Sequence, residues 1–417
     1  MIFNKKLCLT LYFLFCLVFN LLAQKVAIVN PPNNIKSIEL KPLKVNTYAP
    51  IIKLGEPIVL SFDDLDGDEK NYTYTILHCT YDWKKSKIPA TEYLNGLKTD
   101  NIRNYNNAFN TYQAYTHYKL IIPNDKVKLK ISGNYILQVK DDYDNIVFNR
   151  RFMVYETKVT VGVSVHKSRD IKWFNTHQNI QFIVKTNGLI INNPRDEIKI
   201  NIYQNNDWNT LKDNIKPQFY ANNNLIYKYA DKSLFEAGNE FLYFDTKNIR
   251  TATNNVFKSV LKDIYNTYLY TDEARKNKPY TFYPDIDGNF VIRNLSEETA
   301  VTEADYSWVH FKLDIPLQTD KSIYVYGDFN DWQLHSNNKM IYDKTDKMYK
   351  TSLLLKQGFY NYKYVIKSND SLNLNAISGN FYQTENNYTV LVYFSEFGSR
   401  YDKLIGIGSA NSKNLQN

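Results

Sequence analysis

A run of carboxylates between residues 63 and 69 is the first place where this chain could hold a metal ion. It reads Asp63-Asp64-Leu65-Asp66-Gly67-Asp68-Glu69, and carboxylate oxygens are the ligands that calcium takes in proteins. The run lacks the full spacing of an EF-hand loop and its distal glutamate. We therefore expect a solvated hairpin turn here, with calcium binding as the alternative.

Other patterns that would support enzyme chemistry are weak. The six histidines form no HExxH or HxH pair, and no GxSxG elbow, P-loop or dinucleotide-binding motif is present. Asp285 and Asp287 could form a carboxylate pair for glycoside hydrolysis, but they flank an Asp-Gly-Asn turn, and turn formation accounts for them better. We predict no catalytic residue, no cofactor and no bound metal, and expect that the protein is not an enzyme.

A turn that ends on a tryptophan is the most informative local motif. A strand at 323–326 leads into Gly327-Asp328-Phe329-Asn330-Asp331-Trp332, and Gly, Asp and Asn favour tight turns. Exposed aromatic rings stack on sugars and anchor protein interfaces. Asp328, Asn330 and Trp332 are therefore the candidate interaction or structural-turn residues. We expect Trp332 to pack inward and fix the turn, with a sugar-stacking platform as the alternative.

An aromatic strand, Phe359-Tyr360-Asn361-Tyr362-Lys363-Tyr364, follows this turn. The order of turn and aromatic strand resembles a starch-binding-like, early-set immunoglobulin sandwich. Such modules bind sugars or mediate protein docking, and they rarely catalyse reactions.

The first 23 residues have the features of a secretory signal peptide. Lys5 and Lys6 precede an apolar stretch at 7–22, which ends at Ala23, and cleavage is expected after Ala23. A retained anchor helix is the alternative. No second apolar stretch is long enough to span a bilayer as a helix, so the mature protein is not expected to span a membrane.

Cysteine content and charge exclude further classes. Two of the three cysteines lie in the expected signal peptide, which leaves Cys79 alone in the mature chain. A disulfide-stapled extracellular protein is therefore excluded, and Cys79, within an apolar strand pattern, is expected to be a buried structural thiol. The net charge of +8 is spread along the chain without a Lys/Arg cluster, which argues against nucleic-acid binding.

The chain reads as strands almost throughout, which predicts an all-β protein of tandem immunoglobulin-like β-sandwich domains. Residues 159–165 and 198–202 place valines and isoleucines at every second position. Outer-membrane barrels alternate too, but the irregular strand spacing favours sandwiches. We predict a first β-sandwich at 35–155, a second β-rich domain at 157–295, a C-terminal sandwich at 304–397 and a mobile tail at 398–417.

The order of several short motifs resembles the type IX secretion system plug proteins of Bacteroidota, a family long described only as a domain of unknown function. Each motif is weak alone, but their order and spacing are specific and span nearly all of the mature chain. The matching segments are 60–65, 74–83, 92–96, 115–118, 132–135, 234–241, 244–245, 283–290 and 327–332.

This resemblance implies a non-enzymatic periplasmic protein associated with the outer membrane. It implies a plug that closes the large outer-membrane β-barrel translocon of type IX secretion through protein–protein interaction, with no catalytic residues to transfer. The alternative is a carbohydrate-binding module protein that uses aromatic residues of the C-terminal sandwich and takes a glycan as its partner.

Overall fold

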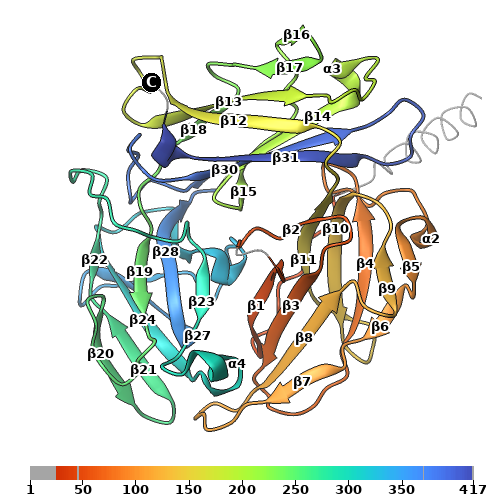
Figure 1. The fold of residues 1–417 in the computed structure, drawn as a ribbon. Helices are drawn as coiled ribbons and strands as arrows, with labels where there is room; N and C mark the ends of the chain where they lie inside the picture. Colours follow the sequence, from red (N-terminus) through yellow and green to blue (C-terminus); the bar gives the residue numbers. More distant parts are fainter. Residues whose placement is uncertain (1–24, 45–46, 370, 416–417) are drawn as a thin grey trace, which may run out of the picture.

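The computed structural model describes residues 25–44, 47–369 and 371–415. The expected signal peptide, residues 1–23, lies outside this range. The described chain is built almost entirely from strands, which confirms the all-β prediction, and its sheets form three sandwiches (Figure 1). Among the described residues, none of the helices has the length and apolar character that crossing a membrane requires.

The first sandwich is formed by residues 35–155. Its two sheets have the orders β1-β3-β8-β7 and β2-β11-β10-β4-β6, and α2 leads into β5 of a separate two-stranded sheet, β5-β9. The elements are β1 (Ile35–Pro42), β2 (Ile51–Lys53), β3 (Ile58–Asp64), β4 (Thr73–Cys79), α2 (Ala90–Tyr93), β5 (Leu94–Gly96), β6 (Thr99–Asn101), β7 (Asn104–Asn107), β8 (Thr116–Ile122), β9 (Val127–Leu129), β10 (Gly133–Lys140) and β11 (Ile146–Tyr155).

The second sandwich combines strands that are far apart in the sequence. One sheet has the order β12-β13-β17-β16, with β18 on β13, and the other has the order β15-β14-β30-β31. The elements are β12 (Thr160–Lys167), β13 (His177–Lys185), α3 (Pro194–Glu197), β14 (Ile198–Gln204), β15 (Asp207–Lys212), β16 (Phe219–Ala221), β17 (Asn224–Tyr227), β18 (Leu234–Glu236), β30 (Asn387–Phe394), β31 (Lys403–Asn411) and η3 (Ser412–Asn414).

The third sandwich is inserted between β18 and β30 of the second. Its sheets are centred on β28, which pairs with β19, β23, β25 and β29, and on β21-β24-β27. The elements are β19 (Leu242–Asp245), β20 (Val256–Leu261), β21 (Tyr265–Leu269), β22 (Asp272–Glu273), β23 (Phe290–Ile292), η1 (Glu297–Thr299), α4 (Ala300–Glu303), β24 (Tyr306–Asp314), β25 (Ser322–Tyr326), η2 (Asp328–Asn330), β26 (Ile341–Asp343), β27 (Met348–Lys356), β28 (Gly358–Lys367) and β29 (Leu372–Asn373).

This grouping differs from the predicted domain boundaries after residue 157. The third sandwich begins at β19, inside the predicted second domain, and β30 leaves the predicted third domain to pair with β14. The predicted mobile tail contains β31, which pairs with β30 along its length. Strand pairing over nearly 200 residues leaves no local trace in the sequence, so the boundaries could not be read from composition.

Each sandwich has its own apolar core, and a fourth cluster joins two of them. Strand β10 is buried on both faces, because one face lines the first core and the other packs on the second sandwich. Cys79 is fully buried in this joining cluster, with Tyr393 and Leu404 of the second sandwich. Burial raises the pKa of the Cys79 thiol to about 12, which suits an inert structural cysteine.

Candidate functional site at the junction of the three sandwiches

The turn at 327–332, called the junction turn below, is closed by its own side chains. Strand β25 ends at Tyr326, and Asp331 and Trp332 adopt left-handed backbone conformations with φ of 55° and 57°. The side chain of Asn330 accepts a hydrogen bond from the Gly327 N–H at 3.3 Å and donates one to the Val325 carbonyl at 2.9 Å. Asn330 therefore stabilises the turn.

Trp332 points inward and is 3% exposed. Its ring packs against Tyr326 and Phe241, with centroid distances of 5.2 and 6.1 Å. A Cβ atom on Gly288 would lie 2.3 Å from its Cη2 atom, so the Gly288 backbone covers the end of the ring. The ring has no free face on which a sugar could stack.

The junction turn is hydrogen-bonded to the second sandwich. Asn209 of β15 donates from Nδ2 to the Trp332 carbonyl at 3.0 Å and to the Tyr326 hydroxyl at 2.7 Å. That hydroxyl donates in turn to Oδ2 of Asp207, also at 2.7 Å. Burial raises the pKa of Asp207. The β14–β15 hairpin thus holds the turn through a buried polar network.

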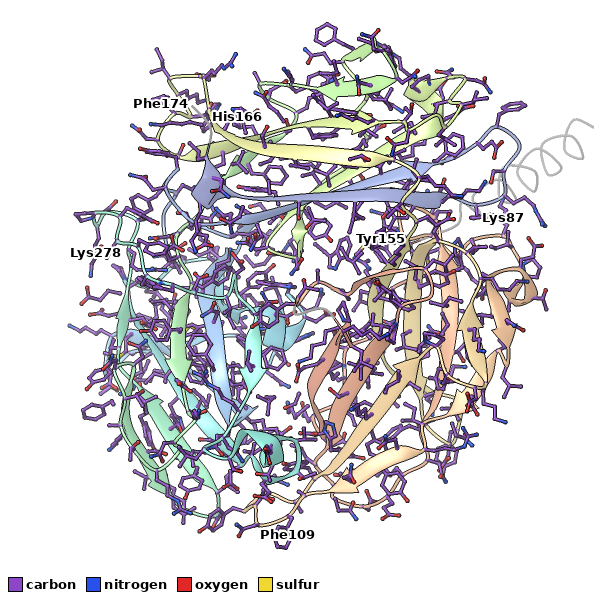
Figure 2. The ribbon with its side chains drawn as sticks, viewed as in Figure 1. Lys87, Phe109, Tyr155, His166, Phe174 and Lys278 are labelled. Atoms are coloured by element: carbon purple, nitrogen blue, oxygen red, sulfur yellow. The ribbon has the colours of Figure 1, made fainter. Side chains whose placement is uncertain are left out.

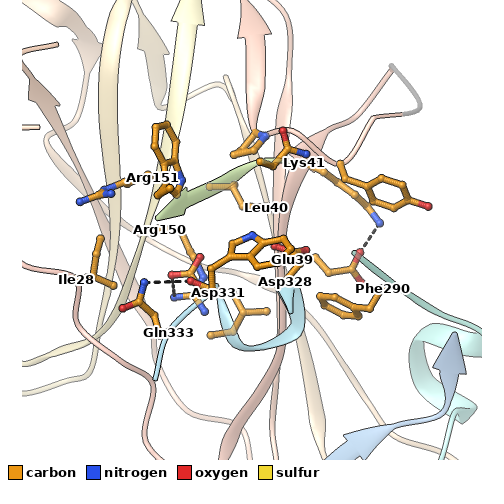
Figure 3. Close-up of a pocket in the computed structure, with 16 residues that line it drawn as sticks. Ile28, Glu39, Leu40, Lys41, Arg150, Arg151, Phe290, Asp328, Asp331 and Gln333 are labelled. Carbon is orange, nitrogen blue, oxygen red and sulfur yellow. Dashed lines mark hydrogen bonds and ion pairs between the residues drawn. The ribbon is translucent and has the colours of Figure 1, made fainter. Parts of the chain in front are cut away.

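The junction turn also faces the first sandwich across a cavity of about 60 Å³. Figure 3 shows Asp328 and Asp331 of the turn near Glu39, Arg150 and Arg151. Asp331 forms an ion pair with Arg150 at 3.6 Å. Burial and the neighbouring Asp331 raise the pKa of Asp328 to about 7. The three candidate residues therefore lie where all three sandwiches meet. Trp332 bonds to the second sandwich through Asn209, whereas Asn330 bonds within its own turn.

A second contact between the first and third sandwiches centres on a buried carboxylate. Asp63 accepts hydrogen bonds from Lys356 Nζ at 2.7 Å and from the Tyr306 hydroxyl at 2.8 Å, and its other oxygen lies 2.6 Å from His117 Nδ1. Burial acts to raise the pKa of Asp63, but Lys356 and His117 outweigh it and hold that pKa below its ordinary value. The carboxylate is therefore charged and fully partnered.

The loop between β7 and β8 of the first sandwich makes further contacts with the third sandwich. Phe109, at the lower end of the molecule in Figure 2, donates its N–H to the Thr302 carbonyl at 3.0 Å. The Tyr112 N–H donates to Asp305 Oδ1 at 2.8 Å, and the Tyr115 hydroxyl donates to the Ala304 carbonyl at 3.1 Å.

The acidic run matches the expected solvated turn only in part, since Asp66, Asp68 and Glu69 are exposed. Asp63 and Asp64 belong to β3 and are fully buried. The carboxylates of Asp64, Asp66 and Asp68 lie within 4.8 Å of one another, which is compatible with a metal ion. However, Lys70 Nζ already forms ion pairs with all three. This lysine supplies the positive charge that a cation would bring.

Asp207, Asn209 and Lys356 hold the junction, but no sequence pattern predicted this role. Each lies in an ordinary strand pattern, and each meets its partner across at least 117 positions of sequence. Only a pairing map of the sandwiches would have identified them.

The comparisons with known proteins agree with this architecture. The family model described as "Type 9 secretion system plug protein 1st domain" matches residues 35–156, which are the first sandwich. A hypothetical protein from Parabacteroides merdae, solved by crystallography, is 33% identical over 93% of this chain and 100% of its own, with a TM-score of 0.90.

The similarity to a second solved structure is too low to support a conclusion about this chain. The native conformation of E. coli alpha-2-macroglobulin is 9% identical over 94% of this chain and 23% of its own, with a TM-score of 0.19. No curated protein matches the chain. At 33% identity over 93% of its length, the chain belongs to the family of the Parabacteroides merdae protein, and its first sandwich matches the type 9 secretion system plug protein 1st domain.

Proposed function

We propose that this protein is a non-enzymatic periplasmic plug that docks on and closes the giant outer-membrane β-barrel translocon of type IX secretion. The observation that carries the proposal is the match of the first sandwich to the plug protein domain. The signal peptide expected at residues 1–23 supplies the route to the periplasm.

The physical requirement for such a plug is a body that keeps its shape. A pore wide enough for folded cargo leaks when idle, and a folded body can block it by steric exclusion without chemistry. The three sandwiches contact one another through the junction turn, the Asp63–Lys356 pair and the cluster around Cys79. Because buried contacts link every pair of sandwiches, domain motion would break well-packed interfaces.

The burial of Trp332 argues against sugar binding as a second function. Its proposed platform was Trp332, and that ring is buried between Tyr326, Phe241 and Gly288.

The test is an affinity pull-down of the tagged mature protein from gently solubilised outer membranes, followed by mass spectrometry. A very large β-barrel protein in near-stoichiometric amount is the expected result. A protein that elutes alone or with polysaccharide would contradict the proposal.

A permeability assay tests closure separately from docking. Cells that lack the protein should take up a large fluorescent dye that wild-type cells exclude, and re-expression should restore exclusion. The control is a deletion strain that also lacks the co-purified barrel, in which the leak should disappear. A leak that persists without the barrel would show that the dye enters by another route.

A further inference from the structure

A cavity of about 750 Å³ lies between the first and third sandwiches. Residues 30–33 and the start of the first sandwich at 35–38 form one wall, and β27 with the loop at 335–338 forms the other. Its volume is within the range of cavities that hold ligands. It is separate from the buried Asp63–Lys356 pair, since neither of those residues lines it.

Two sheet edges reach this cavity. Strand β1 is the end strand of its sheet and pairs only with β3. Strand β27 pairs with β24 along its length, but with β26 only at Met348–Lys350. Within the described chain, no strand pairs with Thr351–Leu355 on the side away from β24. An unpaired edge presents N–H and C=O groups that a further strand can satisfy.

Figure 1 shows β1 at the centre of the molecule, on the side of the first sandwich that faces β23 and β27. The free edge of β27 lines the cavity at Ser352–Leu355, between the first and third sandwiches.

The lining next to this edge is apolar. Leu353, Leu354 and Leu355 reach the cavity, together with Trp308 and Phe290. Leu354 lies opposite Trp308 in the β24–β27 register, and Trp308 is 41% exposed. Side chains on a strand alternate between faces, so an added strand could place apolar groups against this lining.

The charge of the lining is positive. Its cationic side chains are Lys36 and Arg150, and its one carboxylate is Asp331, which already pairs with Arg150. Lys36 has no ion pair or side-chain hydrogen bond with any described residue, and burial lowers its pKa. Burial also lowers the pKa of His335, and Arg150 and Lys36 lower it further. A partner that brings a carboxylate would balance this excess.

We propose that this cavity binds an extended peptide of a partner protein, which adds as a strand to the free edge of β27 and pairs a carboxylate with Lys36. Main-chain hydrogen bonds would supply affinity, and the apolar lining and Lys36 would supply selectivity. The proposal goes beyond the plug function and does not depend on it.

The test uses the full mature chain and fluorescent peptides, with binding measured by fluorescence anisotropy. The parent peptide alternates valine and threonine and carries aspartate at both ends. A second peptide has the same sequence with alternate backbone nitrogens methylated, and a third replaces both aspartates by lysine. The parent should bind, and methylation should weaken binding at least tenfold, because methylated nitrogens cannot donate to a strand edge.

Reversing the charge of Lys36 tests whether this residue contacts the carboxylate of the peptide. Lys36→Glu should weaken binding of the parent by about tenfold, equivalent to about 1.4 kcal/mol, and should strengthen binding of the lysine peptide. This gain of binding cannot arise from misfolding. The control is Lys321→Glu, an exposed lysine of the third sandwich outside the cavity, which should leave both affinities unchanged.

Three outcomes would overturn the proposal. The first is equal binding of the parent and the methylated peptide, and the second is no exchange of preference in Lys36→Glu. The third is displacement of the peptide by a linear glucan such as maltoheptaose, which would assign the aromatic lining to sugar binding.

Discussion

Asp63 of the first sandwich and Lys356 of the third form an ion pair of 2.7 Å whose side chains are 0% and 2% exposed. The remaining polar groups of the pair are also satisfied, since Asp63 bonds to Tyr306 and His117, and Lys356 donates to the Val301 carbonyl at 2.7 Å. Opening this interface would separate the two buried charges, and each would keep only the partner in its own sandwich, which is His117 for Asp63 and the Val301 carbonyl for Lys356.

Removing one member of this pair should destabilise the protein strongly. We expect Lys356→Met to lower the free energy of unfolding by about 3–5 kcal/mol, because it leaves the Asp63 carboxylate buried without its cation. The double variant Asp63→Asn/Lys356→Met should recover part of that loss. Urea unfolding followed by tryptophan fluorescence measures both.

The matched control is Lys350→Met, since Lys350 pairs with Asp343 on the surface, where the two side chains are 31% and 36% exposed. Exposed pairs contribute about 0–1 kcal/mol. Equal effects of the Lys350 and Lys356 variants would contradict the assignment of a buried pair.

Gly288 should tolerate no side chain, because Trp332 occupies the space. Gly288 has φ of 82°, and an added Cβ would lie 2.3 Å from Trp332 Cη2. Gly188 has φ of 84° and no atom within 4 Å of an added Cβ. Alanine at either position carries the left-handed penalty of about 1–2 kcal/mol. We expect Gly288→Ala to cost about 1–3 kcal/mol more than Gly188→Ala, through overpacking, as measured by urea unfolding.

Trp332 should contribute to the stability of the fold and not to sugar binding. We expect Trp332→Ala to lower the free energy of unfolding by about 3–5 kcal/mol, the usual cost of removing a buried aromatic ring. Trp308→Ala, at a half-exposed position, should cost much less. Retention of the folded wild-type protein on polysaccharide columns should not exceed that of an unrelated control protein. Specific retention that Trp332→Ala abolishes at a temperature where the variant is folded would contradict the structural role.

Local patterns were sufficient to predict strands and their buried faces. Val161, Val163 and Val165 line the core of the second sandwich as their alternation predicts, and so do Ile198 and Ile202. Alternation is a local property set by burial on one face, so it survives in the sequence.

The prediction of a mobile tail was wrong because glycine occurs both in flexible segments and where two strands pack closely. The content of Gly, Ser and Asn in residues 398–417 favours a mobile tail, but added Cβ atoms on Gly406 and Gly408 would lie 2.4 and 2.7 Å from side-chain atoms of Val159 and Val161. These glycines let β31 approach β12 closely. Composition cannot separate this packing role from flexibility, because the packed partner lies about 250 positions away.

The prediction of a solvated turn was wrong at Asp63 and Asp64 for a related reason. A run of carboxylates without a nearby partner is expected in solvent, and Asp63 finds Lys356 only when β3 and β27 meet. The burial of Asp63 therefore follows from the contact between the first and third sandwiches, and the sequence of the acidic run does not indicate it.

Glu240 should make stability depend on pH. Its side chain is 1% exposed, and burial raises its pKa from 4.5 to about 7. Between these values the unfolded chain releases a proton that the folded chain keeps, so stability from this group is fully present below pH 4.5 and is lost as pH rises to about 7. We expect the stability of Glu240→Gln relative to wild type to increase by about 3 kcal/mol over this interval.

Urea unfolding at a series of pH values measures this difference. Above about pH 7.5 it should become constant, because Glu240 is then ionised in both states. Glu273→Gln is the control, because a hydrogen bond from Lys278 lowers the pKa of the exposed Glu273, so its relative stability should fall slightly as pH rises. A Glu240→Gln difference that stays flat from pH 4.5 to 7, or changes with the sign of the Glu273 control, would show that Glu240 is ionised inside the folded protein.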